Sequence, residues 1–194
     1  MVEEPEDVLV ERAAQGDTGA VDLLLQRHLP GLRAYVRLRL GPSLRAKEET
    51  CDVVQSICRD VLGNLGRFRY PGESAFRAWL FMTAQRKIAD KVEYWSAQKR
   101  EVDREAPIEE VYRTLTSPSG AAMGSEAIER LETAFDALSD DQREVILLSR
   151  IVGLTREEVA ARMGRSEAGV RNLLHRALAE LSEHYDRGSG ASGA

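Results

Sequence analysis

Hydrophobic residues recur at intervals of three and four along most of the chain, which places them on one face of an α-helix. The clearest example is the stretch from Ser74 past Trp95, whose apolar members are Phe76, Leu80, Ala84, Ile88, Val92 and Trp95. At ~1.5 Å per residue, a helix of this length spans roughly 30 Å and crosses a small domain. Good helix formers also recur throughout the sequence. The pattern therefore predicts an all-α protein.

The first half of the chain predicts about four helices. They cover residues 8–15, 17–40 and 45–65 and the stretch from Ser74 past Trp95. Gly16 is expected to end the first helix and Asp17 to cap the second, because its carboxylate can accept hydrogen bonds from free backbone N–H groups. Pro30 is expected to break or restart the second helix, and Gly41-Pro42 to end it.

The third predicted helix carries the two cysteines of the chain. Its apolar stripe is read as Cys51, Val54, Cys58, Val61 and Leu65. On this stripe the cysteines are expected to be buried structural residues, with a redox switch as the alternative. Their number and spacing fit neither a disulfide framework nor a zinc site.

The second half predicts helices with sharper boundaries. They cover residues 126–138, 140–152, 155–163 and 166–185. The segments Ser139 to Gln142 and Thr155 to Glu158 both have the form of a capping box, in which two side chains satisfy backbone N–H groups reciprocally. Gly164 is expected to close the short third helix, and Ser166 to cap the last one.

The composition changes between the two helical halves, where prolines and small residues interrupt the periodicity. We therefore predict two small helical domains, a flexible linker and a disordered tail rich in glycine and serine. The predicted ranges are 7–100 for the first domain, 101–125 for the linker, 126–186 for the second domain and 187–194 for the tail.

The last two predicted helices have the proportions of a helix-turn-helix, with Gly164 in the turn. In such a unit the first helix braces the second, and residues near the start of the second meet base edges in the major groove. The stripe expected to be buried is Val170, Leu174, Leu178 and Leu181. The residues predicted to contact DNA are Arg165, Ser166, Glu167, Ala168, Arg171, Asn172, His175 and Arg176. An ordinary helical hairpin with a solvated polar face is the alternative.

Charge and composition exclude several classes of function. The net charge of -5 argues against indiscriminate binding to nucleic acid, but it allows local positive charge or binding beside a larger partner. We find no glycine-rich phosphate loop, metal-ligand cluster or arranged nucleophile, so we predict no enzyme, cofactor or metal. No stretch approaches ~20 apolar residues and the first residues are acidic, so neither membrane insertion nor a signal peptide is expected, and a cytoplasmic location is predicted.

The second half resembles region 4 of the sigma-70 family. The matching segments are Arg143 with Val145 and Ile146, then 153–160, 164–166 and 170–177, in the family's order and spacing. By analogy, this domain reads the −35 promoter element. Response regulators carry similar helix-turn-helix units, so the first domain must separate the two classes.

The first half resembles region 2 of the extracytoplasmic-function (ECF) group of the same family. Residues 9–28, Asp52-Val-Val-Gln55 and Phe76-Arg-Ala-Trp-Leu80 match its motifs. The resemblance implies an ECF sigma factor that binds core RNA polymerase, directs it to promoter DNA and promotes initiation. It also implies silencing by an anti-sigma factor. A stand-alone helix-turn-helix regulator that binds DNA as a dimer is the alternative.

The resemblance also assigns roles to residues of the first domain. Asp52 and Gln55, with Arg59 on the same helix face, are expected to dock on the polymerase clamp helices, with a merely solvated helix face as the alternative. Residues 67–73 are expected to capture a base flipped from the −10 element, through either Phe68 or Tyr70, and a core role for Phe68 is the alternative. The residues expected to follow the −10 DNA are Arg86, Lys87, Lys91, Lys99 and Arg100.

The sequence departs from the family's pattern in two places. Residues 93–100 carry fewer arginines than is usual at the end of region 2. In the recognition helix, Leu173 occupies a position where arginine is frequent, and Gly169 one where threonine is frequent. The promoter sequence therefore cannot be inferred from relatives.

Overall fold

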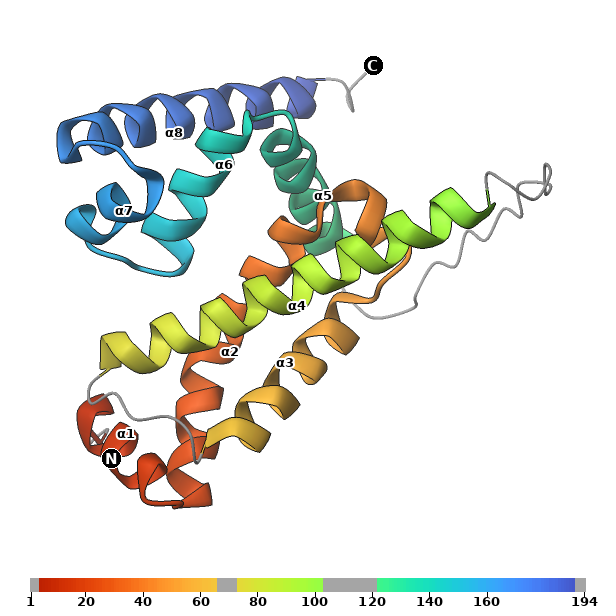
Figure 1. Cartoon of the computed structure of the whole chain (residues 1–194). Helices are drawn as coiled ribbons and strands as arrows, with labels where there is room; N and C mark the ends of the chain where they lie inside the picture. The colour runs from red at the N-terminus through yellow and green to blue at the C-terminus, as the bar shows by residue number, and fades with distance from the viewer. Residues whose placement is uncertain (1–3, 66–72, 103–121, 191–194) are drawn as a thin grey trace.

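The computed structural model describes residues 4–65, 73–102 and 122–190, and every element of secondary structure within these ranges is a helix (Figure 1). The helices are α1 (Glu6–Ala14), α2 (Thr18–Arg45), α3 (Thr50–Asn64), α4 (Glu73–Val102), α5 (Ala122–Asp136), α6 (Asp140–Ile146), the π-helical turn η2 (Leu147–Ile151), α7 (Arg156–Met163) and α8 (Glu167–Gly190). The predicted all-α fold is confirmed. Within the described ranges, none of the helices has the length and hydropathy of a membrane span.

Helix α2 is the spine of the first domain and contacts α1, α3 and α4. Its start matches the prediction, because the Asp17 carboxylate accepts from the backbone N–H groups of Gly19 at 2.9 Å and Ala20 at 3.2 Å. The core beneath α2 is apolar, with Val53 from α3 and Phe76 from α4 fully buried. Burial of such side chains is the main driving force that holds the four helices together.

The expected break at Pro30 is wrong, because α2 continues through this residue. An interior proline costs about 3 kcal/mol of helix stability. We attribute its tolerance to the core side chains Leu32 and Val36, which α2 buries in the following turns. The true kink is at Gly41, where φ is 65° and ψ is 169°, and a short helical turn follows it to Arg45. Consequently α3 begins at Thr50, five residues later than predicted.

The predicted cysteine stripe of α3 is wrong for Cys51, which is exposed. Its other members agree with the prediction in part, because Val54 and Val61 are buried and Cys58 and Leu65 pack partly buried against the core. The stripe left out Val53 and Ile57, which are fully buried. Burial raises the pKa of the Cys58 thiol, which keeps this thiol protonated and unreactive.

The second domain has the two predicted capping boxes and the predicted glycine end of α7. The Thr155 backbone N–H donates to the Glu158 carboxylate at 2.7 Å, and the Glu158 backbone N–H donates to the Thr155 hydroxyl at 3.2 Å. The Ser139 backbone N–H donates to the Gln142 side chain at 2.9 Å. Gly164 ends α7 with φ 62° and ψ 36°, a left-handed conformation that favours glycine.

The helix predicted over 140–152 changes its hydrogen-bond pattern partway, from α6 to the π-helical turn η2. Such a turn accommodates one extra residue. Both Leu147 and Leu148 are buried there, with 1% and 3% of their surface exposed. At the ends of the domain, α5 begins inside the predicted linker and α8 continues into the predicted tail as far as Gly190. Residues 103–121 and 191–194 lie outside the described part.

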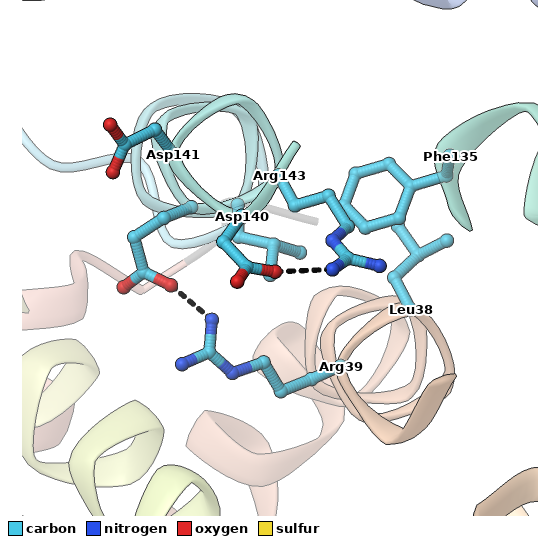
Figure 2. Close-up of a pocket in the computed structure, with 8 residues that line it drawn as sticks. Leu38, Arg39, Phe135, Asp140, Asp141 and Arg143 are labelled. Atoms are coloured by element: carbon cyan, nitrogen blue, oxygen red, sulfur yellow. Dashed lines mark hydrogen bonds and ion pairs between the residues drawn. The ribbon is translucent and has the colours of Figure 1, made fainter. Parts of the chain in front are cut away.

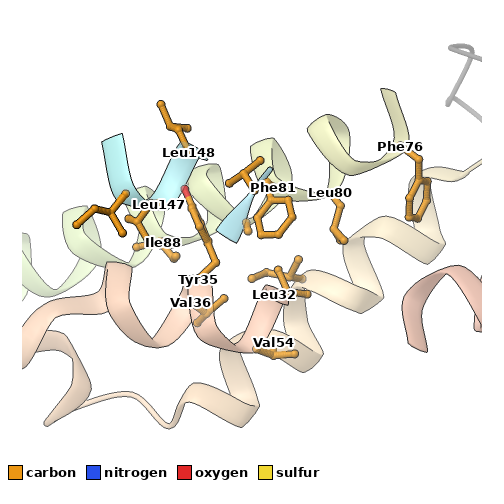
Figure 3. Packing of buried hydrophobic residues seen from close by; sticks show 14 of the residues in the cluster. Leu32, Tyr35, Val36, Val54, Phe76, Leu80, Phe81, Ile88, Leu147 and Leu148 are labelled. Carbon is orange, nitrogen blue, oxygen red and sulfur yellow. The ribbon is translucent and has the colours of Figure 1, made fainter. Parts of the chain in front are cut away.

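The two domains pack against each other along α2. Helix α5 and the η2 turn both contact α2, and α6–α8 lie over α4 in Figure 1. Figure 2 shows part of this contact, where Arg39 of α2 reaches toward α6 and Leu38 lies beside Phe135 of α5. Figure 3 shows Leu147 and Leu148 beside Tyr35, Phe81 and other core residues of the first domain. One continuous hydrophobic cluster therefore runs through both domains.

Candidate nucleic-acid interface

The candidate DNA-reading surface is built by α7, the turn at Gly164 and α8. The Ser166 hydroxyl accepts from the Gly169 backbone N–H at 3.1 Å, so Ser166 caps α8 as predicted. Helix α7 contacts both α8 and η2 and buries Val159. The buried face of α8 includes Val170, and Leu174, Leu178 and Leu181 are packed partly buried against the core. This anchoring fixes the direction in which the opposite face of α8 points.

The predicted DNA-contacting residues all lie exposed at the start of α8 and in the turn before it. They are Arg165, Ser166, Glu167, Ala168, Arg171, Asn172, His175 and Arg176. Arg165 is held by an ion pair with Asp141 of α6. The side chains of Arg171, Asn172, His175 and Arg176 have no hydrogen-bond or ion-pair partner among the described residues. These four therefore form one polar face of α8 that is free to contact another molecule.

The residues predicted to contact the −10 element differ in whether they are already paired with acids in the free protein. Lys87 pairs with Asp60 of α3 at 2.7 Å, and Lys91 pairs with Glu48 at 2.6 Å. Arg86 is exposed to solvent. Lys99 and Arg100 lie in α4, but their side chains are outside the described part of the chain. Residues 67–72, including Phe68 and Tyr70, are also outside it, so the base-capturing loop stays a prediction.

Glu48 lies in the connection between α2 and α3 and contacts the second half of α4. Its carboxylate accepts from Lys91 at 2.6 Å and from the Trp95 indole N–H at 2.9 Å. The Lys47 ammonium lies 4.8 Å from the centre of the Trp95 ring, in a cation–π contact. Burial raises the pKa of Glu48, but the hydrogen bonds from Lys91 and Trp95 outweigh it and hold that pKa below its usual value.

The predicted polymerase-docking residues Asp52, Gln55 and Arg59 are all exposed. They alternate along α3 with the buried residues Val53 and Ile57, which turn inward. The structure therefore brings the three polar side chains to one solvent-facing side of α3, as the spacing predicted.

Comparison with known proteins identifies the family. The model described as "Sigma-70 region 2" matches residues 24–101, and the one described as "Sigma-70, region 4" matches residues 128–181. The ECF RNA polymerase sigma factor SigD of Mycobacterium tuberculosis is 32% identical over 180 residues, which cover 91% of this chain and 82% of SigD. The chain belongs to the ECF sigma factors of the sigma-70 family.

Other relatives agree with this assignment. The ECF sigma factor ShbA of Streptomyces griseus is 34% identical over 179 residues, which cover 89% of this chain and 91% of ShbA. A solved structure of CnrH in complex with the cytosolic domain of CnrY is 28% identical, with a TM-score of 0.54, and covers 94% of this chain and 97% of CnrH. The predicted family, two-domain fold and role in directing transcription initiation are confirmed. An ECF sigma factor is an initiation factor and not an enzyme.

Two features of this sigma factor's recognition helix were not apparent from the sequence. Leu173, at a position where arginine is frequent in the family, is only 7% exposed and faces the core. It therefore adds to the buried face of α8. Gly169 lies in the first turn of α8, where its backbone N–H donates to the Ser166 hydroxyl. A Cβ atom at this position would lie 3.2 Å from the Ser166 hydroxyl oxygen.

The sequence analysis also missed two arginines beside the recognition helix. Arg150 of η2 and Arg156 of α7 line a groove of about 420 Å³ together with Arg171 and His175, and no acidic residue lines it. Its apolar lining is Leu154, Val170, Leu174 and Leu178. Arg150 and Arg156 come from segments before the recognition helix, so periodicity within α8 could not reveal them. Their signal in the sequence is the pair of exposed arginines flanking Gly153-Leu154.

Proposed function

We propose that this ECF sigma factor reads the −35 element with α8, follows the −10 element with α4 and docks on core polymerase with α3. The observation that supports this most is the exposed polar face of α8 formed by Arg171, Asn172, His175 and Arg176. Its side chains are exposed, polar and mostly basic, and they extend from a helix whose other face is fixed in the core. Helices presented in this way fit the major groove.

At the −35 element we assign two kinds of contact. Arg171 and Asn172 lie near the start of α8 and can pair with guanine and adenine respectively. Arg150 and Arg156 lie to the side of α8, so we assign them to DNA phosphates, which set register but carry no sequence information. Arg165, Ser166, Glu167, Ala168, His175 and Arg176 complete the proposed −35 set.

At the −10 element, Arg86 is proposed as the first contact because it is already exposed. Lys87 and Lys91 are proposed to follow the same DNA backbone, as are Lys99 and Arg100. Lys87 and Lys91 are paired with acids in the free protein. When either lysine binds a DNA phosphate, it exchanges one ionic partner for another, so it gains less binding free energy than an unpaired cation would. We propose that Arg86 contributes more than either lysine.

The proposed partners follow from the family. Asp52, Gln55 and Arg59 are proposed to contact the core polymerase, and we place the protein in the cytoplasm because transcription occurs there. CnrH was solved with the cytosolic domain of CnrY. By likeness to CnrH, we propose that an anti-sigma factor also binds this chain. The proposed working units are residues 7–100 and 126–186, joined by a linker.

The test is assembly with core polymerase. The purified wild-type protein is mixed with sigma-free bacterial core polymerase and separated by size exclusion, alongside Asp52→Ala/Gln55→Ala. A matched control, Asp22→Ala/Gln26→Ala, changes an exposed acid and glutamine on α2 instead. We expect the wild type and the control to co-elute with core and the α3 variant to elute alone. If the α3 variant co-elutes with core as the wild type does, Asp52 and Gln55 are not the docking residues and the proposed site on α3 is wrong.

A further inference from the structure

The groove of about 420 Å³ beside the recognition helix lies between α8 and the segment that joins η2 to α7. It has an apolar floor and a polar, mostly cationic rim. The floor consists of Leu154, Val170, Leu174 and Leu178, and the rim consists of Ser149, Arg150, Arg156, Arg171 and His175. We call these residues the basic groove. Its volume falls in the range of small-molecule sites in proteins, which is ~300–1,000 Å³.

The three arginines of the rim have no ion-pair partner among the residues that the structure describes. The neighbouring Arg143 and Arg165, in contrast, are paired with Asp140 and Asp141. None of the residues that line the groove is acidic. Like charges that converge without a counter-charge repel one another, and a bound anion relieves this repulsion. The rim therefore favours an anion.

The leucines of the floor stay partly exposed in the free protein. Leu154, Leu174 and Leu178 are only partly buried against the core, whereas Val170 is 1% exposed. Apolar surface in contact with water gains free energy when an apolar group covers it. A DNA phosphate can pair with the rim, but it has no apolar surface with which to cover the floor. The floor therefore favours a ligand that also has an apolar part.

Both walls of the groove are fixed before a ligand binds. On one side, the Leu154 backbone N–H donates to the Leu148 carbonyl at 3.0 Å. The Thr155 capping box then fixes the start of α7, whose first residue is Arg156. On the other side, the buried Val170 holds α8 against the core. A preformed site loses little conformational entropy when it binds a ligand.

We propose that the basic groove binds a small amphiphilic anion, which is a molecule with an apolar body and one carboxylate or phosphate head. The body lies on the leucines of the floor, and the head accepts hydrogen bonds from the arginines of the rim. A guanidinium presents paired N–H donors that match two oxygens of a carboxylate or a phosphate. The Ser149 hydroxyl supplies one more donor. Neither a neutral apolar molecule nor a bare anion satisfies both parts of the groove.

The bound anion competes with promoter DNA. Arg171 and His175 belong both to the groove and to the proposed −35 face of α8, and Arg150 and Arg156 are the arginines assigned to DNA phosphates. A head that pairs with these cations cancels the positive charge that attracts DNA. The ligand and the −35 element therefore exclude each other. This consequence rests on the proposed function, whereas binding of the ligand does not.

The first test is isothermal titration calorimetry of the full-length protein with octanoate, whose chain is short enough to stay monomeric in solution. Acetate supplies the head without the body, and 1-octanol supplies the body without the head. We expect octanoate to bind at least about tenfold more tightly than either. Octyl phosphate is titrated in parallel. Tight binding of either anion supports the site, and the tighter of the two identifies the preferred head.

A double variant tests whether the rim holds the head. Arg150→Gln/Arg156→Gln removes two cations and keeps two long polar side chains. We expect its affinity for octanoate to fall by about tenfold or more. The matched control Arg33→Gln/Arg187→Gln changes two exposed arginines outside the groove and should bind octanoate as the wild type does. Circular dichroism and thermal unfolding check that both variants are folded.

A second groove of the same domain gives an internal comparison. It lies between α5 and α8, has a volume of about 450 Å³ and is lined without any charged residue by Ala127, Ile128, Leu131, Leu178, Leu181, Ser182 and Tyr185. Octanol should bind this apolar groove at least as well as octanoate does, with no dependence on Arg150 and Arg156. Equal affinities for octanoate and octanol, or octanoate binding that is unchanged in Arg150→Gln/Arg156→Gln, would overturn the basic groove as the anion site.

The second test is competition, which separates this proposal from the proposed function. Fluorescence anisotropy measures how tightly the free wild type binds a −35 duplex, with octanoate or with the same concentration of sodium acetate as the salt control. At ten times its Kd, octanoate should weaken duplex binding about tenfold relative to acetate. Equal duplex binding in the two would show that the anion and DNA do not compete. If the protein does not bind the duplex at all, the −35 assignment fails, while the calorimetry still decides whether the groove binds the anion.

Discussion

We propose that the basic surface around α8 contains two kinds of side chain, those that reach base edges and those that reach only phosphates. Arg171 belongs to the first kind because it is exposed one residue after the buried Val170, near the start of the helix. Arg150 belongs to the second because it extends from η2, to the side of the recognition helix. These two arginines should therefore respond differently to changes in promoter sequence and in salt.

For Arg171→Ala we expect a loss of about 1–3 kcal/mol in binding the native −35 element, together with relaxed preference at one base pair. The physical reason is the loss of a bidentate contact to a base edge. The measurement is holoenzyme binding to the native promoter and to promoters changed singly across the −35 element. Arg187→Ala, at the far end of α8, is the control. An equal loss on every promoter would show that Arg171 contacts only the backbone.

For Arg150→Ala we expect a uniform loss of affinity on all promoters. Each phosphate contact releases counterions, so removing one should reduce the slope of log affinity against log salt by about 1. The measurement is a salt titration of holoenzyme binding to native and substituted promoters. An unchanged slope would place Arg150 away from the DNA, and a loss confined to one sequence would make it a base-reading residue.

At the level of single elements, the boundaries were more predictable than the faces. The Thr155 and Ser139 capping boxes and the Gly164 turn depend on residues close in sequence, so local chemistry determines them. The phase of α3 was missed because Cys51 and Val53 offer competing apolar stripes, and only packing on α2 chooses between them. The π-helical turn over Leu147–Ile151, in which both Leu147 and Leu148 are buried, was not expected from the sequence.

Glu48 holds the second half of α4 through Lys91 and Trp95. This contact gives a prediction about how the stability of the protein depends on pH. Because the pKa of Glu48 is lowered in the folded protein, its contribution to stability is present above the unfolded pKa and is lost as pH falls through the folded value. We expect Glu48→Gln to lower the free energy of unfolding by about 2 kcal/mol at pH 7. The difference from the wild type should shrink as the pH approaches 4.

Urea unfolding of the wild type and Glu48→Gln at pH 7 and at pH 4 measures this difference. The neighbouring Glu49→Gln serves as the control, since Glu49 is exposed and its side chain does not cap α3. A Glu48→Gln cost that is equal at both pH values would mean that the packing of this side chain matters and its charge does not.

At the scale of the whole molecule, the sequence predicted two domains of this family but not the way they meet. Three ion pairs join α2 to the second domain, and they are Arg37 with Glu132, Arg39 with Glu144 and Arg45 with Asp136. Their residues lie 95, 105 and 91 positions apart in the chain. No local pattern connects residues so distant, and each arginine alone is typical of a solvated helix face. These pairs also give the net charge of -5 a local meaning, because three of the acids neutralise arginines of the other domain.

The packing of the two domains leaves α8 open to solvent, and this gives a prediction about the free protein. A short duplex that carries only the −35 element should bind the free wild type as tightly as a duplex that carries both elements. The reason is that a free molecule whose domains are packed together reaches one element at a time and gains nothing from the second. We expect the holoenzyme to place both domains on their elements at once, so the second contact becomes intramolecular and should strengthen binding by a factor of about 10² to 10⁴.

Fluorescence anisotropy on the two duplexes, with and without core polymerase, makes the comparison directly. A third duplex with a scrambled −35 element sets the non-specific level for each form of the protein. If the free wild type already prefers the two-element duplex strongly, its domains separate without polymerase. The ion pairs between α2 and the second domain would then be too weak to keep the recognition helix and α4 together, since the energy gained from one additional DNA contact would be enough to separate the domains.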